Sequence, residues 1–214
     1  MKHTKRISVL LTVAVSFLIA VSILICAGLF VYLHFSDGGF AGEIPEPEKA
    51  QRLSVVSEAQ RWLGVREGFA GHEELVRIYN SHEPLAQGYE LKTRDNWCAA
   101  FASVVAIQCE ITDIVPTECG CERQIGLWQN IGRWEENDNY MPLPGDYIYY
   151  AWDEGWDLGD CTGWADHVGI VVGTAGPFIK VIEGNKDDCV TYRIIPRGYY
   201  QIRGYGLPDY VSIG

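Results

Sequence analysis

The pattern of apolar and polar positions divides the chain into an apolar N-terminal run, a helical part and a part with short strands. Residues 7–35 form an apolar run with no formally charged side chain apart from His34 when it is protonated. After this run, apolar residues recur every three or four positions. This spacing predicts four helices, at 48–63, 72–79, 97–108 and 122–131.

The pattern changes after Trp134, where short segments rich in β-branched and aromatic residues are separated by Gly, Pro or Asp. We expect strands at 146–152, 167–172, 178–183, 190–195 and 202–205. Helices that precede an antiparallel sheet are typical of the α+β class, and the chain shows no internal repeat. The sequence therefore predicts an α+β domain in which N-terminal helices pack on an antiparallel sheet.

The apolar run 7–35 is long enough to cross a membrane. A helix rises about 1.5 Å per residue, and the hydrocarbon core is about 30 Å thick. Lys2, Lys5 and Arg6 precede the run, whereas all 28 acidic residues follow it. The positive-inside rule then predicts a cytoplasmic segment 1–6, a single-pass transmembrane anchor 7–35 and an extracellular remainder at the cell membrane. The alternative is a signal peptide cleaved near residues 39–41, which would release a secreted domain.

Residues 36–48 are rich in Gly, Pro and acidic side chains, and we interpret them as a linker to a domain at 49–214. Without the three basic residues before the run, 14 basic and 28 acidic residues remain, a net charge of −14. So acidic an outer part disfavours binding to nucleic acid.

Six of the seven cysteines follow the apolar run. An extracellular location permits one or two disulfides, and buried thiols are the alternative. Cys119 and Cys121 are separated by one residue, which is too short for a zinc-binding Cys-x-x-Cys pair, and no matching second pair follows. The sequence therefore does not favour structural zinc.

Cys98 begins the predicted helix 97–108, which we expect to be amphipathic, with Asp95 or Asn96 as its N-cap. The unpaired amides and the dipole at a helix N-terminus favour a thiolate. Free cysteines are also among the most buried residue types, so Cys98 is either a nucleophile or a small apolar side chain of the core.

His167 and Glu183 add a base and its partner. His167 begins the predicted strand 167–172 and Glu183 ends the next strand, 178–183. In an antiparallel hairpin that turns at residues 174–177, the start of the first strand lies beside the end of the second. The hairpin therefore places Glu183 next to His167, and Asn185 follows two residues later on the same face. A nucleophilic thiol needs such a base, and the base needs an acceptor that fixes its tautomer.

The motifs NWCAAF, PGDYIYY, DHVGIVV and VIEGN occur in this order. In this order and at these separations they resemble the CHAP family of cysteine amidases and peptidases that act on peptidoglycan, a branch of the papain-like NlpC/P60 superfamily. The resemblance covers about residues 55–208. The segments PTECGC and TGWADHVG are similar to CHAP modules of phage endolysins.

The resemblance implies a papain-like NlpC/P60 (CHAP) fold and a peptidoglycan hydrolase, most simply an N-acetylmuramoyl-L-alanine amidase. It implies that Cys98 attacks the amide, His167 transfers the proton, Glu183 orients His167 and Asn185 helps to fix the site. Many CHAP proteins carry a polar residue before the cysteine, and here Trp97 stands there. We therefore name only the backbone N–H of Cys98 as a hydrogen-bond donor to the oxyanion of the reaction. The alternatives are a stem-peptide or cross-bridge endopeptidase and a non-catalytic protein that binds the cell wall.

We expect Trp97, Trp156 and Trp164 to contact substrate, because aromatic faces suit glycan rings. Asp146, in PGDYIYY, is expected to shape the start of a strand rather than to act in catalysis. The loop 153–166 contains four aspartates and Glu154, which are hard oxygen donors suited to Ca²⁺. Because their spacing does not match an EF-hand, we expect no cofactor or metal and keep Ca²⁺ as the alternative.

Overall fold

The computed structural model describes residues 13, 15–23, 26, 44–137, 139–152 and 161–212. Within these ranges, no helix combines the length and the apolar character needed to span a membrane. Most of the predicted anchor 7–35, the segment 1–6 and most of the linker 36–48 lie outside the described residues. Met1–Asp37 and Gly38–Gly214 form separate compact units, and the second holds all the strands and helices that position the site.

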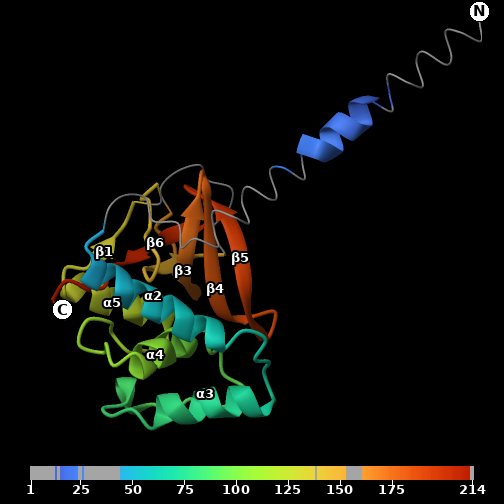
Figure 1. Cartoon of the computed structure of the whole chain (residues 1–214). Helices are drawn as coiled ribbons and strands as arrows, with labels where there is room; N and C mark the ends of the chain where they lie inside the picture. Colours follow the sequence, from blue (N-terminus) through green and yellow to red (C-terminus); the bar gives the residue numbers. More distant parts are fainter. Residues whose placement is uncertain are drawn as a thin grey trace, which may run out of the picture. The chain divides into compact units, whose positions relative to one another are not determined.

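The second unit is α+β, as the sequence predicts. Its helices gather on one side of the sheet, and α3 lies farthest from the strands (Figure 1). The helices are α2 Glu46–Arg61, α3 Ala70–Asn80, α4 Cys98–Gln108 and α5 Cys121–Asn130, with a short 3₁₀ turn η1 at Ala86–Gly88. The strands are β1 Trp134–Glu135, β2 Tyr147–Tyr150, β3 His167–Ala175, β4 Phe178–Lys186, β5 Cys189–Pro196 and β6 Ile202–Gly206.

The six strands form one antiparallel sheet in the order β1-β6-β2-β3-β4-β5. β3 and β4 form the predicted hairpin, in which Ala175 pairs with Phe178 across Gly176 and Pro177. At the other end of this hairpin, Gly169 of β3 pairs with Glu183 of β4. The first residue of β3, His167, therefore lies diagonally from Glu183 on the same face of the sheet.

α4 is the central helix of the unit. It contacts β3 and β4 on one side and α2 and α3 on the other, so residues 98–106 are all buried. The prediction that this helix is amphipathic is therefore wrong, because residues 98–106 are buried on every side of the helix and only its last residue, Gln108, is exposed. Gly184 allows the close approach of helix and sheet, since a Cβ atom there would stand 2.5 Å from Cβ of Phe101.

The opposite face of the sheet carries a second apolar cluster. Its buried members include Ile148 and Tyr150 of β2, Val171 of β3 and Val181 of β4. Since side chains alternate between the two faces of a strand, residues 167, 183 and 193 share the face of these apolar residues. The sheet face that carries His167 and Glu183 is therefore the one that α4 does not cover.

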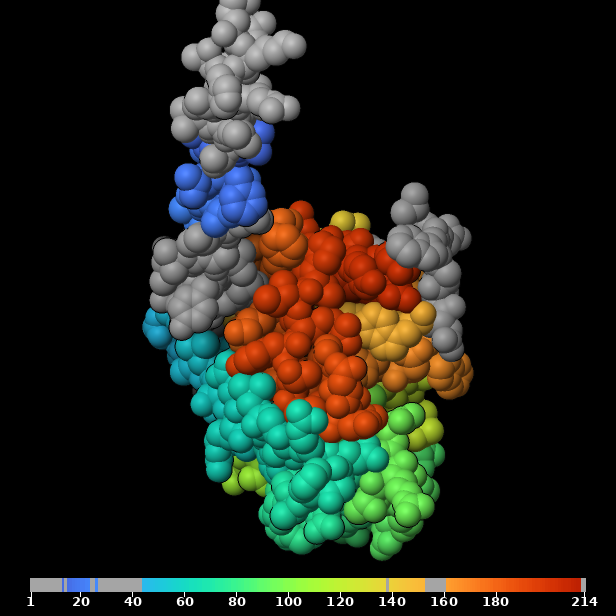
Figure 2. Space-filling view, turned by 90° about the vertical axis from the view of Figure 1, so that its right-hand side faces the viewer, coloured from blue at the N-terminus to red at the C-terminus, as the bar shows by residue number. Residues whose placement is uncertain are grey.

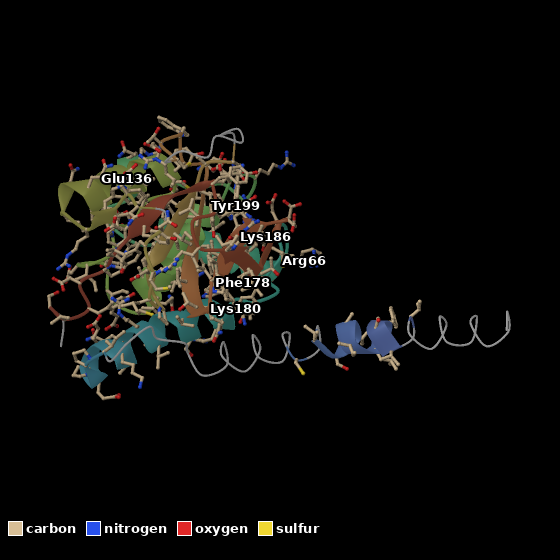
Figure 3. All side chains as sticks on the ribbon, turned by 90° about the horizontal axis from the view of Figure 1, so that it is seen from above. Arg66, Glu136, Phe178, Lys180, Lys186 and Tyr199 are labelled. Atoms are coloured by element: carbon tan, nitrogen blue, oxygen red, sulfur yellow. The ribbon has the colours of Figure 1, made fainter. Side chains whose placement is uncertain are left out.

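The connection between α2 and α3 is fixed to the start of β5. The N–H of Gly64 donates to the carbonyl of Val190 at 2.9 Å, and the N–H of Val190 donates to Val65 at 2.8 Å. In Figure 2 this segment lies against the end of the β4–β5 hairpin. Figure 3 shows Arg66 and Lys186 close together at the same end, where both residues pair with Cys189.

Two sequence predictions at helix starts need correction. α2 begins at Glu46, so the linker predicted at 36–48 ends earlier than expected, because Pro47 fits the first turn of a helix. The N-cap of α4 is Trp97 rather than Asp95 or Asn96, and no side chain caps this helix. The first-turn amides of α4 are therefore not satisfied by a side chain of the N-cap residue.

Candidate active site

Cys98 is the first residue of α4, and its side chain is 4% exposed. Its sulfur lies 3.6 Å from the sulfur of Cys121, the first residue of α5, and 3.9 Å from the carbonyl oxygen of Asp166. The backbone N–H of Ala99 also points at the Cys98 sulfur. The thiol thus lies at the N-terminus of a helix, beside the residue that precedes β3.

His167 and Glu183 are in contact, as the hairpin predicts. Nε2 of His167 lies 3.1 Å from Oε2 of Glu183, and Glu183 is fully buried. Gly169 makes room for this carboxylate, because a Cβ atom there would lie 2.8 Å from Cγ of Glu183. Since Glu183 occupies Nε2, the other ring nitrogen, Nδ1, is the one left for Cys98.

Arg193 of β5 is a second partner of Glu183. Its Nε lies 2.7 Å from Oε1 and 2.9 Å from Oε2 of the carboxylate. The guanidinium also stacks over the ring of Trp152 at 4.7 Å. Burial favours a raised pKa for Glu183, but the hydrogen bonds and charges of His167 and Arg193 outweigh burial and lower this pKa. The carboxylate is therefore held ionised in a buried position.

The electrostatics favour a thiolate and an imidazolium. The pKa of Cys98 is well below its ordinary value, first because Cys121 hydrogen-bonds to the sulfur, and further because of His167 and the Ala99 amide, which together overcome burial. Burial acts to lower the pKa of His167, but its interactions with Cys98 and Glu183 prevail and raise the pKa to about 9. Near neutral pH, Cys98 and His167 therefore form an ion pair.

Asn185 lies at the edge of this group. Its side-chain nitrogen is 3.4 Å from the side-chain oxygen of Asn96, two residues before Cys98. Asn185 has a φ of 59°, and the pairing of β4 with β5 shifts between Glu183 and Lys186. Because of this irregularity, simple alternation does not assign Asn185 to a face of the sheet, so its place on the face of Glu183 stays a prediction. The position of Asn185 beside the segment that leads into Cys98 is what the structure shows.

A pocket of about 540 Å³ opens beside Asn96. It is lined by the segment between α3 and α4 and by residues at the start of α5: Gln87, Tyr89, Leu91, Asp95, Asn96, Cys119 and Arg123. The pocket therefore borders the N-termini of both α4 and α5, where Cys98 and Cys121 lie. A second pocket of about 440 Å³ shares Gln87 with it and continues along α5.

The three tryptophans predicted to contact substrate have different positions. Trp97 is fully buried, its Nε1 donates to Glu67 at 3.2 Å, and its ring lies 4.9 Å from that of His72. Its predicted role in substrate binding is therefore wrong, because the ring is part of the core. Trp164 is 75% exposed and remains a predicted contact. Trp156 and residues 153–160 of the predicted calcium loop lie outside the described residues.

Asp146 supports the start of β2, as predicted. Its Oδ2 accepts the N–H of Leu143 at 2.8 Å, and its Oδ1 accepts a hydrogen bond from Arg52 at 2.8 Å. Of the alternatives for the cysteines, disulfides are not what the structure shows: within the described residues, no disulfide joins any of them, and Cys98, Cys121 and Cys189 are buried.

Sequence reasoning missed Arg193 and the contact of Cys121 with Cys98. The contact of Arg193 with Glu183 follows from the strand pairing. Thr191 is the direct partner of Glu183, and Arg193, two positions further along β5, lies on the same face of the sheet as Thr191 and Glu183. Cys121 had only its place near the start of a predicted helix. Tertiary packing decides which helix N-termini come into contact. The sequence pattern of a single helix does not predict this packing.

Comparison with protein families and with curated proteins identifies no relative of this chain. The chain matches none of the protein-family descriptions against which it was compared, and no curated protein is significantly similar to it.

Proposed function

We propose that the chain is a cysteine hydrolase that cleaves an amide bond in peptidoglycan, most simply the bond between N-acetylmuramic acid and L-alanine. The observation that carries the proposal is the buried set in which His167 interacts with both Cys98 and Glu183. A thiol, a base and an orienting carboxylate are the parts of nucleophilic thiol catalysis. The substrate class and the papain-like NlpC/P60 (CHAP) fold are supported by the motifs NWCAAF, PGDYIYY, DHVGIVV and VIEGN.

In the first half of the proposed reaction, the Cys98 thiolate attacks the carbonyl carbon of the amide. A carbon–sulfur bond forms, and the carbonyl oxygen becomes an oxyanion. The backbone N–H of Cys98 is the donor that we assign to this oxyanion, because the first N–H groups of a helix have no intrahelical acceptor. His167 then gives its proton to the leaving nitrogen, the carbon–nitrogen bond breaks, and a thioester remains on Cys98.

In the second half, neutral His167 accepts a proton from water, and the resulting hydroxide attacks the thioester. The carbon–sulfur bond breaks, the acid product leaves, and the thiolate–imidazolium pair is restored. Glu183 stabilises the imidazolium and fixes the ring, because its carboxylate accepts the hydrogen bond of Nε2. Arg193 keeps this carboxylate ionised and in place, so we assign it as a positioning residue.

The pocket beside Asn96 is the approach that we assign to the substrate. It combines the aromatic ring of Tyr89, the carboxylate of Asp95 and the guanidinium of Arg123, which is half exposed while it pairs with Glu118. A stem peptide offers amides and carboxylates that suit such a lining. Trp164 is exposed enough to stack on a sugar ring.

The location that we propose follows from the sequence. An anchor at 7–35, with the N-terminus in the cytoplasm, would hold the catalytic unit outside the cell and limit it to cell wall within reach of its linker. Cleavage near residues 39–41 would instead release it. We propose no nucleic-acid partner, because the net charge after the run is −14.

The test is a digest of purified peptidoglycan with the wild-type chain and the Cys98→Ala variant, followed by mass spectrometry of the products. We expect the wild type to release stem peptides from glycan strands and Cys98→Ala to release none while it keeps its fold. Cys109→Ala is the matched control, because Cys109 directly follows the last residue of α4, at the opposite end of the helix from Cys98, and its substitution should leave digestion unchanged.

The products also separate the alternatives. New termini inside the stem peptide or the cross-bridge would replace the amidase assignment with an endopeptidase. Undiminished digestion by Cys98→Ala would remove the mechanism. Binding to peptidoglycan without any cleavage by the wild type would identify a protein that binds the wall and does not hydrolyse it.

A further inference from the structure

The proposed mechanism uses one thiol, but a second thiol touches it. The sulfurs of Cys98 and Cys121 are 3.6 Å apart, and the two residues are 4% and 5% exposed. Each is the first residue of its helix, α4 or α5, and both are free. A disulfide bond is about 2.05 Å long, so the two sulfurs need to approach by only about 1.5 Å to form one.

We propose that Cys98 and Cys121 form an oxidant-responsive dithiol, in which a peroxide converts the pair into a disulfide that blocks the nucleophile and a thiol reductant restores it. The contact between the two sulfurs is the observation that carries this inference. The consequence for activity rests on the proposed function, whereas the formation of the disulfide does not.

The two thiols are suited to different steps. Attack on a peroxide requires a thiolate, and the environment of Cys98 favours this form. Cys121 is the contrasting partner, since the hydrogen bond to Cys98 and burial both raise its pKa and keep it a thiol. Cys98 is therefore the residue that meets the oxidant, and Cys121 is the residue that resolves the product.

The reaction balances with hydrogen peroxide as the oxidant. The Cys98 thiolate attacks one peroxide oxygen, the sulfur–oxygen bond forms, the oxygen–oxygen bond breaks, and hydroxide leaves with a proton from His167 as water. The sulfur of Cys121 then attacks the Cys98 sulfenic acid. The sulfur–sulfur bond forms, the sulfur–oxygen bond breaks, and the thiol proton leaves with the hydroxyl as a second water. The two sulfurs lose two electrons, which reduce one peroxide to water.

The neighbouring Cys119 does not offer the same reaction. Its sulfur lies 3.7 Å from a guanidinium nitrogen of Arg123, and the described contacts of Cys98 include no other cysteine than Cys121. The pocket nearby is lined by Asn96 and Cys119, which stand two residues before Cys98 and Cys121. Hydrogen peroxide is little larger than the water that such pockets hold.

The experiment is peptide mapping by mass spectrometry of the full chain after stoichiometric hydrogen peroxide, with and without later dithiothreitol. We expect one cross-linked peptide that joins Cys98 to Cys121, a loss of both thiols to iodoacetamide, and recovery of both after reduction. Cys121→Ser keeps a hydroxyl beside Cys98 but cannot form the bond. When this variant is treated with an excess of hydrogen peroxide, we expect Cys98 to proceed to sulfinic and sulfonic acids, each step consuming one further peroxide, and dithiothreitol does not reverse these products.

Cys109→Ser is the matched control and should form the same cross-link as the wild type. The inference is overturned if peroxide leaves both thiols reactive, or if Cys98 is over-oxidised in the wild type while Cys121 remains alkylatable. If Cys121→Ser does not fold, the wild-type map decides alone. Because the map reads sulfur chemistry and not wall digestion, a chain that forms the disulfide but digests nothing would refute the proposed function and leave this inference standing.

Discussion

The guanidinium of Arg193 holds the carboxylate of Glu183, with its Nε 2.7 Å from Oε1 and 2.9 Å from Oε2, while Nε2 of His167 lies 3.1 Å from Oε2. Glu183 is therefore shared between a fixed cation and a base that changes its charge. A carboxylate buried with only one of these partners would be less firmly held in its ionised form.

We predict that Arg193→Met lowers kcat/KM by about one to two orders of magnitude, because a charge-assisted hydrogen bond contributes about 1.5–3 kcal/mol. Arg193→Lys should recover part of the loss, since it keeps the charge but not the planar fork. Arg197→Met, on an exposed residue just after β5, is the control. The readout is kcat/KM against pH. A uniform loss with an unchanged profile, and no recovery in Arg193→Lys, would show that Arg193 is only structural.

We predict that digestion by the wild type has a bell-shaped dependence on pH. Activity should fall in acid when Cys98 takes up its proton, and this limb should lie well below the ordinary pKa of a thiol. It should fall in alkali as His167, whose pKa is about 9, loses the proton that the leaving amine needs. The rate of Cys98 alkylation against pH measures the acid limb independently. An alkylation rate that rises only near the pKa of a free thiol would contradict the ion pair.

We predict that Glu183→Gln moves the alkaline limb to lower pH, because one of the two partners that raise the pKa of His167, the other being Cys98, loses its negative charge. kcat/KM should fall by roughly two to four orders of magnitude, as expected when the orienting carboxylate of a catalytic base is lost. Glu74→Gln, at an exposed ion pair on α3, is the control and should keep the wild-type profile. An alkaline limb that stays near its wild-type position would argue that Glu183 does not act on His167.

For this chain, the sequence predicts the helices and strands better than it predicts which of them pack against one another. Period and turn residues locate the helices and strands, and the β3–β4 hairpin alone places Glu183 beside His167. Trp97 shows the limit of this reasoning. The position of its ring, beside that of His72, is set by the packing of α3 against α4 and not by its neighbour in sequence, Cys98. The shift in strand pairing after Glu183 likewise arises between β4 and β5, so the sequence pattern of β4 alone does not predict it.

The chemistry of the candidate site divides in the same way. Cys98 and His167 could be proposed because each stands at the start of its own element. Cys121 could not, because its contact with Cys98 exists only once α5 has packed beside α4. Arg193 lies between these cases: its face follows from strand pairing, but only after the register of β4 with β5 is known.

We predict that Arg52→Met destabilises the fold by about 3–5 kcal/mol, because it leaves the fully buried carboxylate of Asp146 without its cation. The penalty should shrink as pH falls, since burial raises the pKa of Asp146 and a protonated Asp146 needs no cation. Urea unfolding at several pH values measures this. Arg61→Ala removes an exposed ion pair from the same helix and should change stability by less than about 1 kcal/mol. Equal effects of both substitutions would contradict the assigned role.

We predict that Gly184→Ala impairs activity by moving α4, although Gly184 carries no reacting group. The added methyl group would stand 2.5 Å from Cβ of Phe101, three residues after Cys98, so helix and strand have to separate. We expect a loss of about 1–3 kcal/mol in stability and slower alkylation of Cys98, because the thiol leaves its place beside His167. Gly126→Ala, on α5 with open space around it, is the matched control and should stabilise the helix by about 0.5–1 kcal/mol. If Gly184→Ala keeps the wild-type alkylation rate while it loses stability, the close approach of α4 to β4 supports the fold but does not position the thiol.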